Sequence, residues 1–287
     1  MPKVRIGVIG GTGLYQMEGL TQLRELHVET PFGKPSDAIT LGNLEGIPVA
    51  FLPRHGRGHR FSPTHIPARA NIYALKSLGV EHIISVSAVG SLKEEIVPLD
   101  IVIPDQLIDR TRSRSNTFFD QGMVAHVAFA QPFCPALSDI LFQQAQGLGV
   151  PVHRGGTYVV MEGPQFSTKA ESHLYRSWGA SVIGMTALPE AKLAREAEIC
   201  YATLACATDY DCWHEAEASV SVEMVLANLQ KNVATSQRIL QRVIPQIPLD
   251  RCCPCPSALQ KAIVTAPEAI PQETRERLVL LIRKYIP

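Results

Sequence analysis

YATLACATDYDCW, residues 201–213, decides the fold more than any other stretch of the sequence. Its apolar part, 202–207, predicts a strand that is buried on both faces. Asp209 and Asp211 follow this run, just past the carboxyl end of the strand, and ligands of α/β sheets bind at that edge. Side chains two apart on an extended chain point the same way, so both carboxylates could face one ligand. The alternative is that Asp209 caps a helix and Asp211 is solvated.

The composition limits the class of protein. A chain of 287 residues, 46% of them hydrophobic, can form one large α/β domain or two smaller ones with a sizeable core. Lys and Arg number 27, as do Asp and Glu, so no overall field favours nucleic acid or an anionic membrane as a partner. No apolar run approaches the roughly 20 residues of a membrane span. The N-terminus, MPKVRIGVIGGTG, does not resemble a signal peptide, so we expect a cytoplasmic protein.

Strands and helices are predicted to alternate along most of the chain. Expected strands cover 4–9, 48–52, 82–89, 98–104, 157–161 and 180–184, and expected helices 67–78, 134–148, 185–198, 220–240 and 272–285. Residues 105–120 are polar and predict a loop. Thr168 and Glu171 predict a capping box that opens a further helix. We therefore expect an α/β fold: a single domain, 1–245, with a central mixed β-sheet flanked by helices, and a helical extension, 246–287, packed on it or on a partner subunit.

Polar groups follow several of the predicted strands. The loop GGTG, 10–13, can bring backbone N–H groups against an anion, although Gln16 replaces the third glycine of a dinucleotide-binding fingerprint. RHGRGHR, 54–60, favours an anion pocket over a solvated basic loop, because its glycines allow close backbone approach. The strand ends thus give a basic and hydroxylated half and an acidic half. Their residues are Gly11, Thr12, Arg54, His55, Ser87, Ala88, Met185, Thr186, Asp209 and Asp211.

The seven cysteines do not form a metal motif by their spacing. Cys252, Cys253 and Cys255 are clustered, but zinc needs a fourth ligand and no His or Cys follows them. A redox pair or ordinary surface thiols remain as interpretations. We therefore expect no metal.

Many short segments of this chain resemble, in the same order, those of one enzyme family. They are IGGTGL, TPFGKPSD, RHGRGH, SAVGSL, DIVIPDQLIDRT, EGPQFST, AES, GMTALPEAKLAREAEICYA and ATDYDCW, between residues of about 6 and 245. The family is that of the S-methyl-5′-thioadenosine phosphorylases, within the trimeric purine nucleoside phosphorylases. The resemblance implies phosphorolysis of S-methyl-5′-thioadenosine to adenine and 5-methylthioribose 1-phosphate, in purine and methionine salvage. It also implies a homotrimer or a dimer of trimers, with inorganic phosphate as co-substrate and no cofactor.

The resemblance also implies roles for individual residues. Phosphate would be held by Thr12, Arg54, His55, Ser87, Ala88 and Thr186. The nucleoside would be held by Phe166, Ser167, Met185, Asp209, Asp211, Val222, Val225, Leu226 and, from a neighbouring subunit, His126. Asp209 and Asp211 would be the catalytic pair: the departing purine gains negative charge, which a protonated Asp209 would neutralise.

Two other functions stay open at this point. One is a purine nucleoside phosphorylase acting on inosine, guanosine or methylthioinosine, although such enzymes for 6-oxopurines carry Asn where Asp209 stands. The other is a nucleoside-binding protein without catalysis, which the intact Arg54, His55 and Asp209 positions argue against. The chain departs from the family pattern at Ser87, where many relatives have Thr, and after about residue 246. A stabilising Cys-X-Cys bridge occurs in some thermostable relatives, and Pro254 and a third thiol argue against it here.

Overall fold

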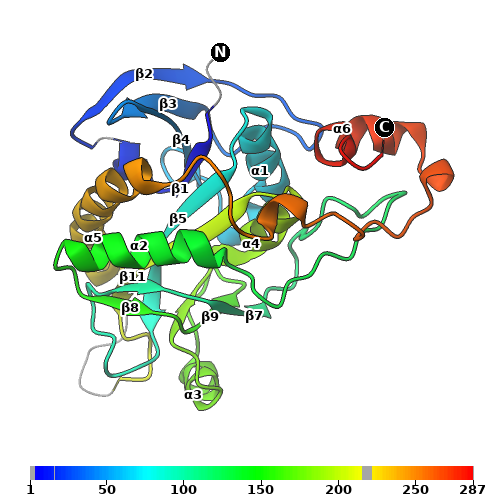
Figure 1. The fold of residues 1–287 in the computed structure, drawn as a ribbon. Coiled ribbons are helices and arrows are strands. Elements are labelled where there is room, and N and C mark those ends of the chain that lie inside the picture. Colours follow the sequence, from blue (N-terminus) through cyan, green and yellow to red (C-terminus); the bar gives the residue numbers. More distant parts are fainter. Residues whose placement is uncertain (1–3, 16, 215–221, 287) are drawn as a thin grey trace.

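The centre of the molecule is a group of four parallel strands, seen in a computed structural model that describes residues 4–15, 17–214 and 222–286 (Figure 1). They are β4 (Ile47–Pro53), β1 (Ile6–Gly10), β5 (His82–Ser91) and β11 (Cys200–Asp209), in that spatial order. Ile6 is in register with both Val49 and His82, and His82 with Cys200. The four strands therefore start at one edge and end at the other, which collects their carboxyl ends.

Shorter strands make the sheet mixed. Within the described residues it has eleven strands. The antiparallel pairs β2–β3, β3–β4, β5–β10 and β6–β11 surround the parallel group, while β7, β9 and β10 run parallel to one another, as do β6 and β8. These strands are β2 (Leu20–Leu26), β3 (Ile39–Leu44), β6 (Ile101–Ile103), β7 (Gln106–Arg110), β8 (Val152–Arg154), β9 (Thr157–Met161) and β10 (Val182–Gly184).

Helices cover both faces of the sheet. α1 (Ala68–Ser77) and α4 (Ala187–Glu196) pack together on one face, and α2 (Pro135–Gly147) and α5 (Val222–Val243) on the other (Figure 1). α3 (Lys169–Ser177) begins with the predicted capping box, in which Thr168 and Glu171 bond reciprocally. The remaining helices are α6 (Gln272–Ile282) and the 3₁₀ turns Thr12–Tyr15, Pro63–His65, Ile244–Gln246, Cys255–Ser257 and Pro267–Ala269.

The C-terminal segment packs on the body of the same chain. Leu278 and Ile282 of α6 are buried in one hydrophobic cluster with Ile72 of α1. Glu198, just before β11, accepts hydrogen bonds from the backbone N–H of Leu259 and from the Tyr285 hydroxyl. Apolar burial and a buried carboxylate thus both hold this segment to the sheet.

The observed fold is the expected α/β type with a central mixed sheet. The expectation of a loop over 105–120 is wrong, because 106–110 form β7, a strand at the edge of the sheet. β2, β3 and β8 were also not anticipated. No helix in the described part of the chain combines the length and apolarity needed to cross a bilayer.

Candidate active site

A cavity of about 630 Å³ opens at the carboxyl ends of the four central strands. Its walls come from the carboxyl-terminal halves of β5 and β11, from the segments that follow β1 and β4, from the loops after β9 and β10, and from one side of α5. This is the edge at which ligands of α/β sheets bind. The polar groups predicted at separate strand ends are therefore brought around one space.

One end of the cavity carries hydroxyl groups without partners. The Oγ of Ser87, in the carboxyl-terminal half of β5, and the Oγ1 of Thr186, after β10, are buried and have no hydrogen-bond partner among the described residues. The hydroxyl of Tyr158, which packs against Gly184 beside Ser87 and Thr186, also has no hydrogen-bond partner among these residues, but Tyr158 is not part of the cavity lining. Buried polar groups normally have partners. The hydroxyls of Ser87 and Thr186, which line the cavity, are therefore suited to bind an oxyanion there.

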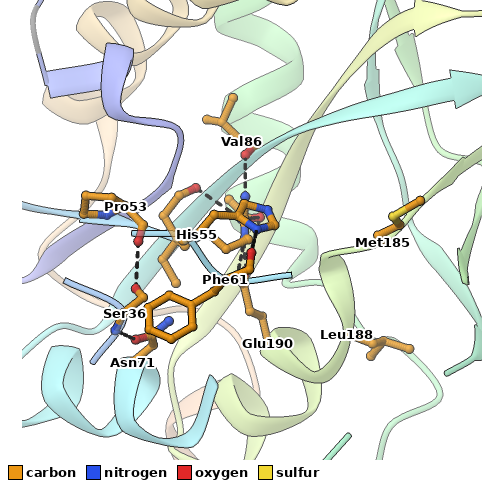
Figure 2. A network of polar contacts seen from close by, with 12 residues as sticks. Ser36, Pro53, His55, Phe61, Asn71, Val86, Met185, Leu188 and Glu190 are labelled. Carbon is orange, nitrogen blue, oxygen red and sulfur yellow. Dashed lines mark hydrogen bonds and ion pairs between the residues drawn. The ribbon is translucent and has the colours of Figure 1, made fainter. Parts of the chain in front are cut away.

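Arg54 lies behind this end and is already bound to protein groups. Its guanidinium donates to Glu190 from Nε (2.6 Å) and Nη2 (3.1 Å), to the Val86 carbonyl from Nη1 (2.9 Å) and to Ser85 Oγ from Nη2 (2.7 Å) (Figure 2). Arg54 is only 2% exposed. Within the described residues, these bonds use the hydrogen on Nε, both hydrogens on Nη2 and one of the two hydrogens on Nη1. Arg54 can therefore offer an anion one N–H and its positive charge.

His55 also faces the cavity, and it is neutral near pH 7. Burial lowers the pKa of His55 to about 4, although its hydrogen bond to the Phe61 carbonyl acts in the opposite direction. Nδ1 lies 2.8 Å from that carbonyl oxygen, which can only accept, so Nδ1 carries the proton and Nε2 is left as an acceptor (Figure 2). His55 thus suits an anion that still carries a proton.

The strand end that carries His55 is itself anchored. The hydroxyl of Ser36 donates to the Pro53 carbonyl (2.7 Å), and its backbone N–H donates to Asn71 Oδ1 (2.8 Å) (Figure 2). The loop after β4 is therefore tied to α1. The residue before His55 in this loop follows directly from the anchored Pro53, and the His55 ring itself is held by its bond to the Phe61 carbonyl.

The other end of the cavity carries Asp209 and Asp211. The carboxylate of Asp209 accepts hydrogen bonds from Thr208 Oγ1 (2.6 Å) and from the backbone N–H of Asp211 (2.8 Å). Asp211 has a φ of 52°, a left-handed conformation that Asp tolerates better than most residues. Both residues line the cavity. They do so because the chain turns after Asp209, where β11 ends, and not because the strand continues in extended form. The predicted reason for their common orientation is therefore wrong.

Burial makes the acidic end chemically distinct. Burial raises the pKa of Asp211, although the hydroxyls of Ser172 and Ser167 oppose this effect. Both carboxyl groups are at most 9% exposed. Two buried carboxyl groups that lie side by side favour a state with one proton between them, and the group that carries this proton can donate it. This end can therefore serve a group that gains negative charge.

Two helix residues fix the position of these carboxylates. On α5, Asn228 Nδ2 donates to the Thr208 carbonyl (2.7 Å), and Asn232 Nδ2 to the Ala207 carbonyl (3.0 Å). They are four residues apart and so lie on one side of the helix. Sequence reasoning missed both, although this spacing of two amides on a predicted helix was visible.

Between the two ends lies Met185, held by an arginine that sequence reasoning missed. Arg114 Nη1 donates to the carbonyls of Met185 (2.5 Å) and Leu188 (2.7 Å), and its side chain is 2% exposed. Its Nη2 donates to the carbonyls of Met161 and Glu162. Arg114 thus joins the loops after β9 and β10. A ligand at this point would meet the N–H of Met185 more readily than its engaged carbonyl.

The remaining predicted residues are placed as follows. Phe166 lines the cavity and is 49% exposed, at its rim, whereas Ser167 lies beside Asp211 outside the lining. His126 is exposed and does not line the cavity of its own chain. The side chains of Thr12, Val222, Val225 and Leu226 lie outside the described residues.

Comparisons with known proteins agree on one family. Residues 5–245 match the model of the phosphorylase superfamily. The chain is 61% identical to S-methyl-5′-thioadenosine phosphorylase of Geobacter sulfurreducens, over 98% of this chain and 99% of that one. It is 56% identical to the protein of the same name from Thermosynechococcus vestitus, with the same coverage.

Solved structures show the same likeness. A methylthioadenosine phosphorylase from an antarctic soil metagenomic library superposes with a TM-score of 0.94 and 52% identity, covering 98% of this chain and 99% of that chain. Methylthioadenosine phosphorylase from Schistosoma mansoni in complex with adenine gives a TM-score of 0.82 at 37% identity, covering 86% and 93%.

Proposed function

The chain belongs to the phosphorylase superfamily, and we propose that its cavity is the site where inorganic phosphate cleaves S-methyl-5′-thioadenosine to adenine and 5-methylthioribose 1-phosphate. The protein is an enzyme, a pentosyltransferase. The observation that carries the proposal is one cavity with unpartnered hydroxyls at one end and two buried carboxyl groups at the other. We place the activity in cytoplasmic purine and methionine salvage.

Phosphate occupies the hydroxylated end in this proposal. Ser87 and Thr186 donate their hydroxyl hydrogens to phosphate oxygens, and the Ala88 backbone and Thr12 complete the set. Arg54 adds positive charge, which its bond to Glu190 partly offsets. His55 accepts the hydrogen of a protonated phosphate oxygen at Nε2. Phosphate is thereby aligned with the sugar, which replaces a bimolecular encounter by attack within one complex.

Adenine occupies the acidic end. As a phosphate oxygen bonds to C1′ of the ribose, the C1′–N9 bond breaks and its electron pair moves into the purine. Protonated Asp209 donates its hydrogen to N7, which neutralises this charge, and Asp211 accepts from the 6-amino group. Phe166 stacks on the ring, and Ser167 helps to hold Asp211.

The sugar and its sulfur substituent lie between these two ends. The N–H of Met185 binds the ribose hydroxyls, while Arg114 holds the carbonyl of the same residue. Val222, Val225 and Leu226 surround the methylthio group. We propose a homotrimer, alone or as half of a dimer of trimers, in which His126 reaches the cavity of a neighbouring subunit.

The test is a comparison of purine release from two nucleosides. The enzyme is supplied with S-methyl-5′-thioadenosine or inosine, each with and without inorganic phosphate. Adenine release that requires phosphate and exceeds hypoxanthine release supports the proposal. Adenine release without phosphate contradicts phosphorolysis, and faster turnover of inosine contradicts the substrate.

A further inference from the structure

Four thiols from three distant parts of the chain meet at the edge of the sheet opposite the cavity. Cys134 precedes α2, Cys200 is the first residue of β11, and Cys253 and Cys255 lie beyond α5. All four Sγ atoms lie within 4.8 Å of one another. Cys200 and Cys253 are the pair whose Sγ atoms lie 3.4 Å apart.

This spacing suits a single metal ion. Four sulfur atoms placed tetrahedrally at about 2.3 Å from zinc are roughly 3.8 Å from one another. A disulfide needs two sulfur atoms at about 2.05 Å and leaves the other thiols unused. The four thiols in this structure are free. A multi-iron cluster would hold its ligands farther apart than the observed limit.

We propose that Cys134, Cys200, Cys253 and Cys255 bind one structural zinc ion. The residue types support zinc, since thiolates are its preferred ligands in closed, four-coordinate sites. Cys134, Cys200 and Cys255 are each 1% exposed and Cys253 is half-buried, so four thiolates would fill the coordination positions and only the Cys253 side of the site approaches the surface. Each thiol that is protonated before binding releases its hydrogen to solvent as its sulfur bonds to the metal.

The surroundings favour the negative charge that four thiolates give such a site. Cys134 precedes the N-terminus of α2, where the helix dipole stabilises a thiolate. Arg251 supplies a positive charge two residues before Cys253 in the chain. Arg251 donates to the Glu198 carbonyl, and so is fixed near the cluster.

The metal would fasten the C-terminal segment to the sheet. Cys253 and Cys255 belong to that segment, whereas Cys134 and Cys200 belong to the body of the fold. Cys200 begins β11 and Asp209 ends it, and ten residues of strand span about 30 Å. The site is therefore remote from the cavity, and it acts on stability and not on chemistry.

This site cannot be recognised from the spacing of the cysteines in the sequence. The cluster at 252–255 supplies two ligands, and the other two become neighbours only when β11 and α2 fold together. The backbone N–H of Cys134 donates to the Tyr201 carbonyl (2.8 Å), which fixes these two elements relative to each other. We expected no metal from the sequence because no fourth ligand follows the cysteines of 252–255.

Cys252 provides a matched control, because it is exposed and lies outside the group of four. The full chain is purified with reductant and without chelator, and its metal content is measured. We expect one zinc per chain for the wild type and for Cys252→Ser, and less than about a tenth of that for the double variant Cys253→Ser, Cys255→Ser. A strong chelator should lower the Tm of the first two proteins only.

A second measurement covers the case in which the double variant does not fold. Wild-type protein stripped of metal is supplied with Co²⁺, and its absorption is recorded. A spectrum typical of tetrahedral cobalt with four thiolates supports the site. The proposal is overturned by wild-type protein that takes up neither zinc nor cobalt, by a disulfide within the group, by iron as the resident metal, or by equal zinc in the double variant.

Discussion

Arg54 and Glu190 form an ion pair in the interior, with Nε and Oε1 2.6 Å apart and both side chains at most 3% exposed. The carboxylate also accepts from the Tyr201 hydroxyl (3.0 Å). This pair joins the end of β4 to α4 across the sheet. It places a cation directly behind the phosphate end of the cavity, and it prevents that cation from swinging into the ligand space.

Removing the charge of Glu190 should destabilise the protein strongly. Glu190→Gln leaves Arg54 charged and buried without its counter-ion, which typically costs about 3–5 kcal/mol. The exposed pair of Asp139 and Arg154 supplies the control, since Asp139→Asn should cost about 1 kcal/mol or less. Urea unfolding of the three proteins measures the difference. Equal losses in the two variants would show that the interior pair is not structural.

The hydroxyls of Ser87 and Thr186 should contribute to phosphate binding and not to the free energy of unfolding. Ser87→Ala and Thr186→Val each remove a hydrogen bond to a charged ligand, worth about 1.5–3 kcal/mol, so the KM for phosphate should rise roughly ten- to a hundredfold. Thr203→Val is the control, because its buried Oγ1 also lacks a partner but lies outside the cavity. A phosphate KM unchanged in both cavity variants would exclude these hydroxyls as ligands.

Glu196 should make stability depend on pH. Burial raises its pKa to about 7, although hydrogen bonds from Thr117 and Phe118 oppose the shift. The pKa of Glu196 in the folded protein exceeds the unfolded value of 4.5. Its contribution to the free energy of unfolding is therefore fully present below about pH 4.5 and is lost as pH rises toward 7.

Glu196→Gln copies the protonated form and should remove this dependence. Its unfolding free energy, relative to that of the wild type, should increase by on the order of 2 kcal/mol between pH 5 and pH 8. Taking the difference between the two proteins cancels other groups, including His82, whose pKa burial lowers to about 4. A difference that stays constant over this pH range would contradict the assignment.

His126 should affect substrate binding only in the assembled protein. The residue is exposed in one chain, so His126→Ala should leave the unfolding free energy of that chain nearly unchanged. It should raise the KM for S-methyl-5′-thioadenosine, whereas the exposed His27→Ala should not. Light scattering should give the mass of three chains or of six. Identical KM values in a confirmed trimer would remove His126 from the site.

The buried strands were predictable because their sequence leaves little choice. In β5 and β11 nearly every residue is apolar or small, as expected for strands covered on both faces. Two of the missed strands, β2 and β7, have no such pattern. β2 and β7 lie at the two ends of the strand order, and their side chains are mostly exposed, so neither alternation nor apolar runs mark them.

The candidate site was predictable where its residues directly follow buried strands, since parallel strands bring those positions together. Glu190 and Arg114 were missed for the opposite reason. Glu190 lies on a helix and Arg114 in a polar stretch, and each gains its role only through contacts with residues far along the chain. The same holds for Cys134 and Cys200, which meet Cys253 and Cys255 only in the folded protein.

The most direct test of the account is the turnover of S-methyl-5′-thioadenosine by Asp209→Asn. An amide keeps the shape of the side chain but cannot give up a hydrogen to N7, and general acids typically contribute about 10²–10⁴ in rate. We predict that kcat falls at least about a hundredfold, while the KM for phosphate and the unfolding free energy stay close to wild type. A kcat equal to that of the wild type would contradict the assignment of Asp209 as the proton donor.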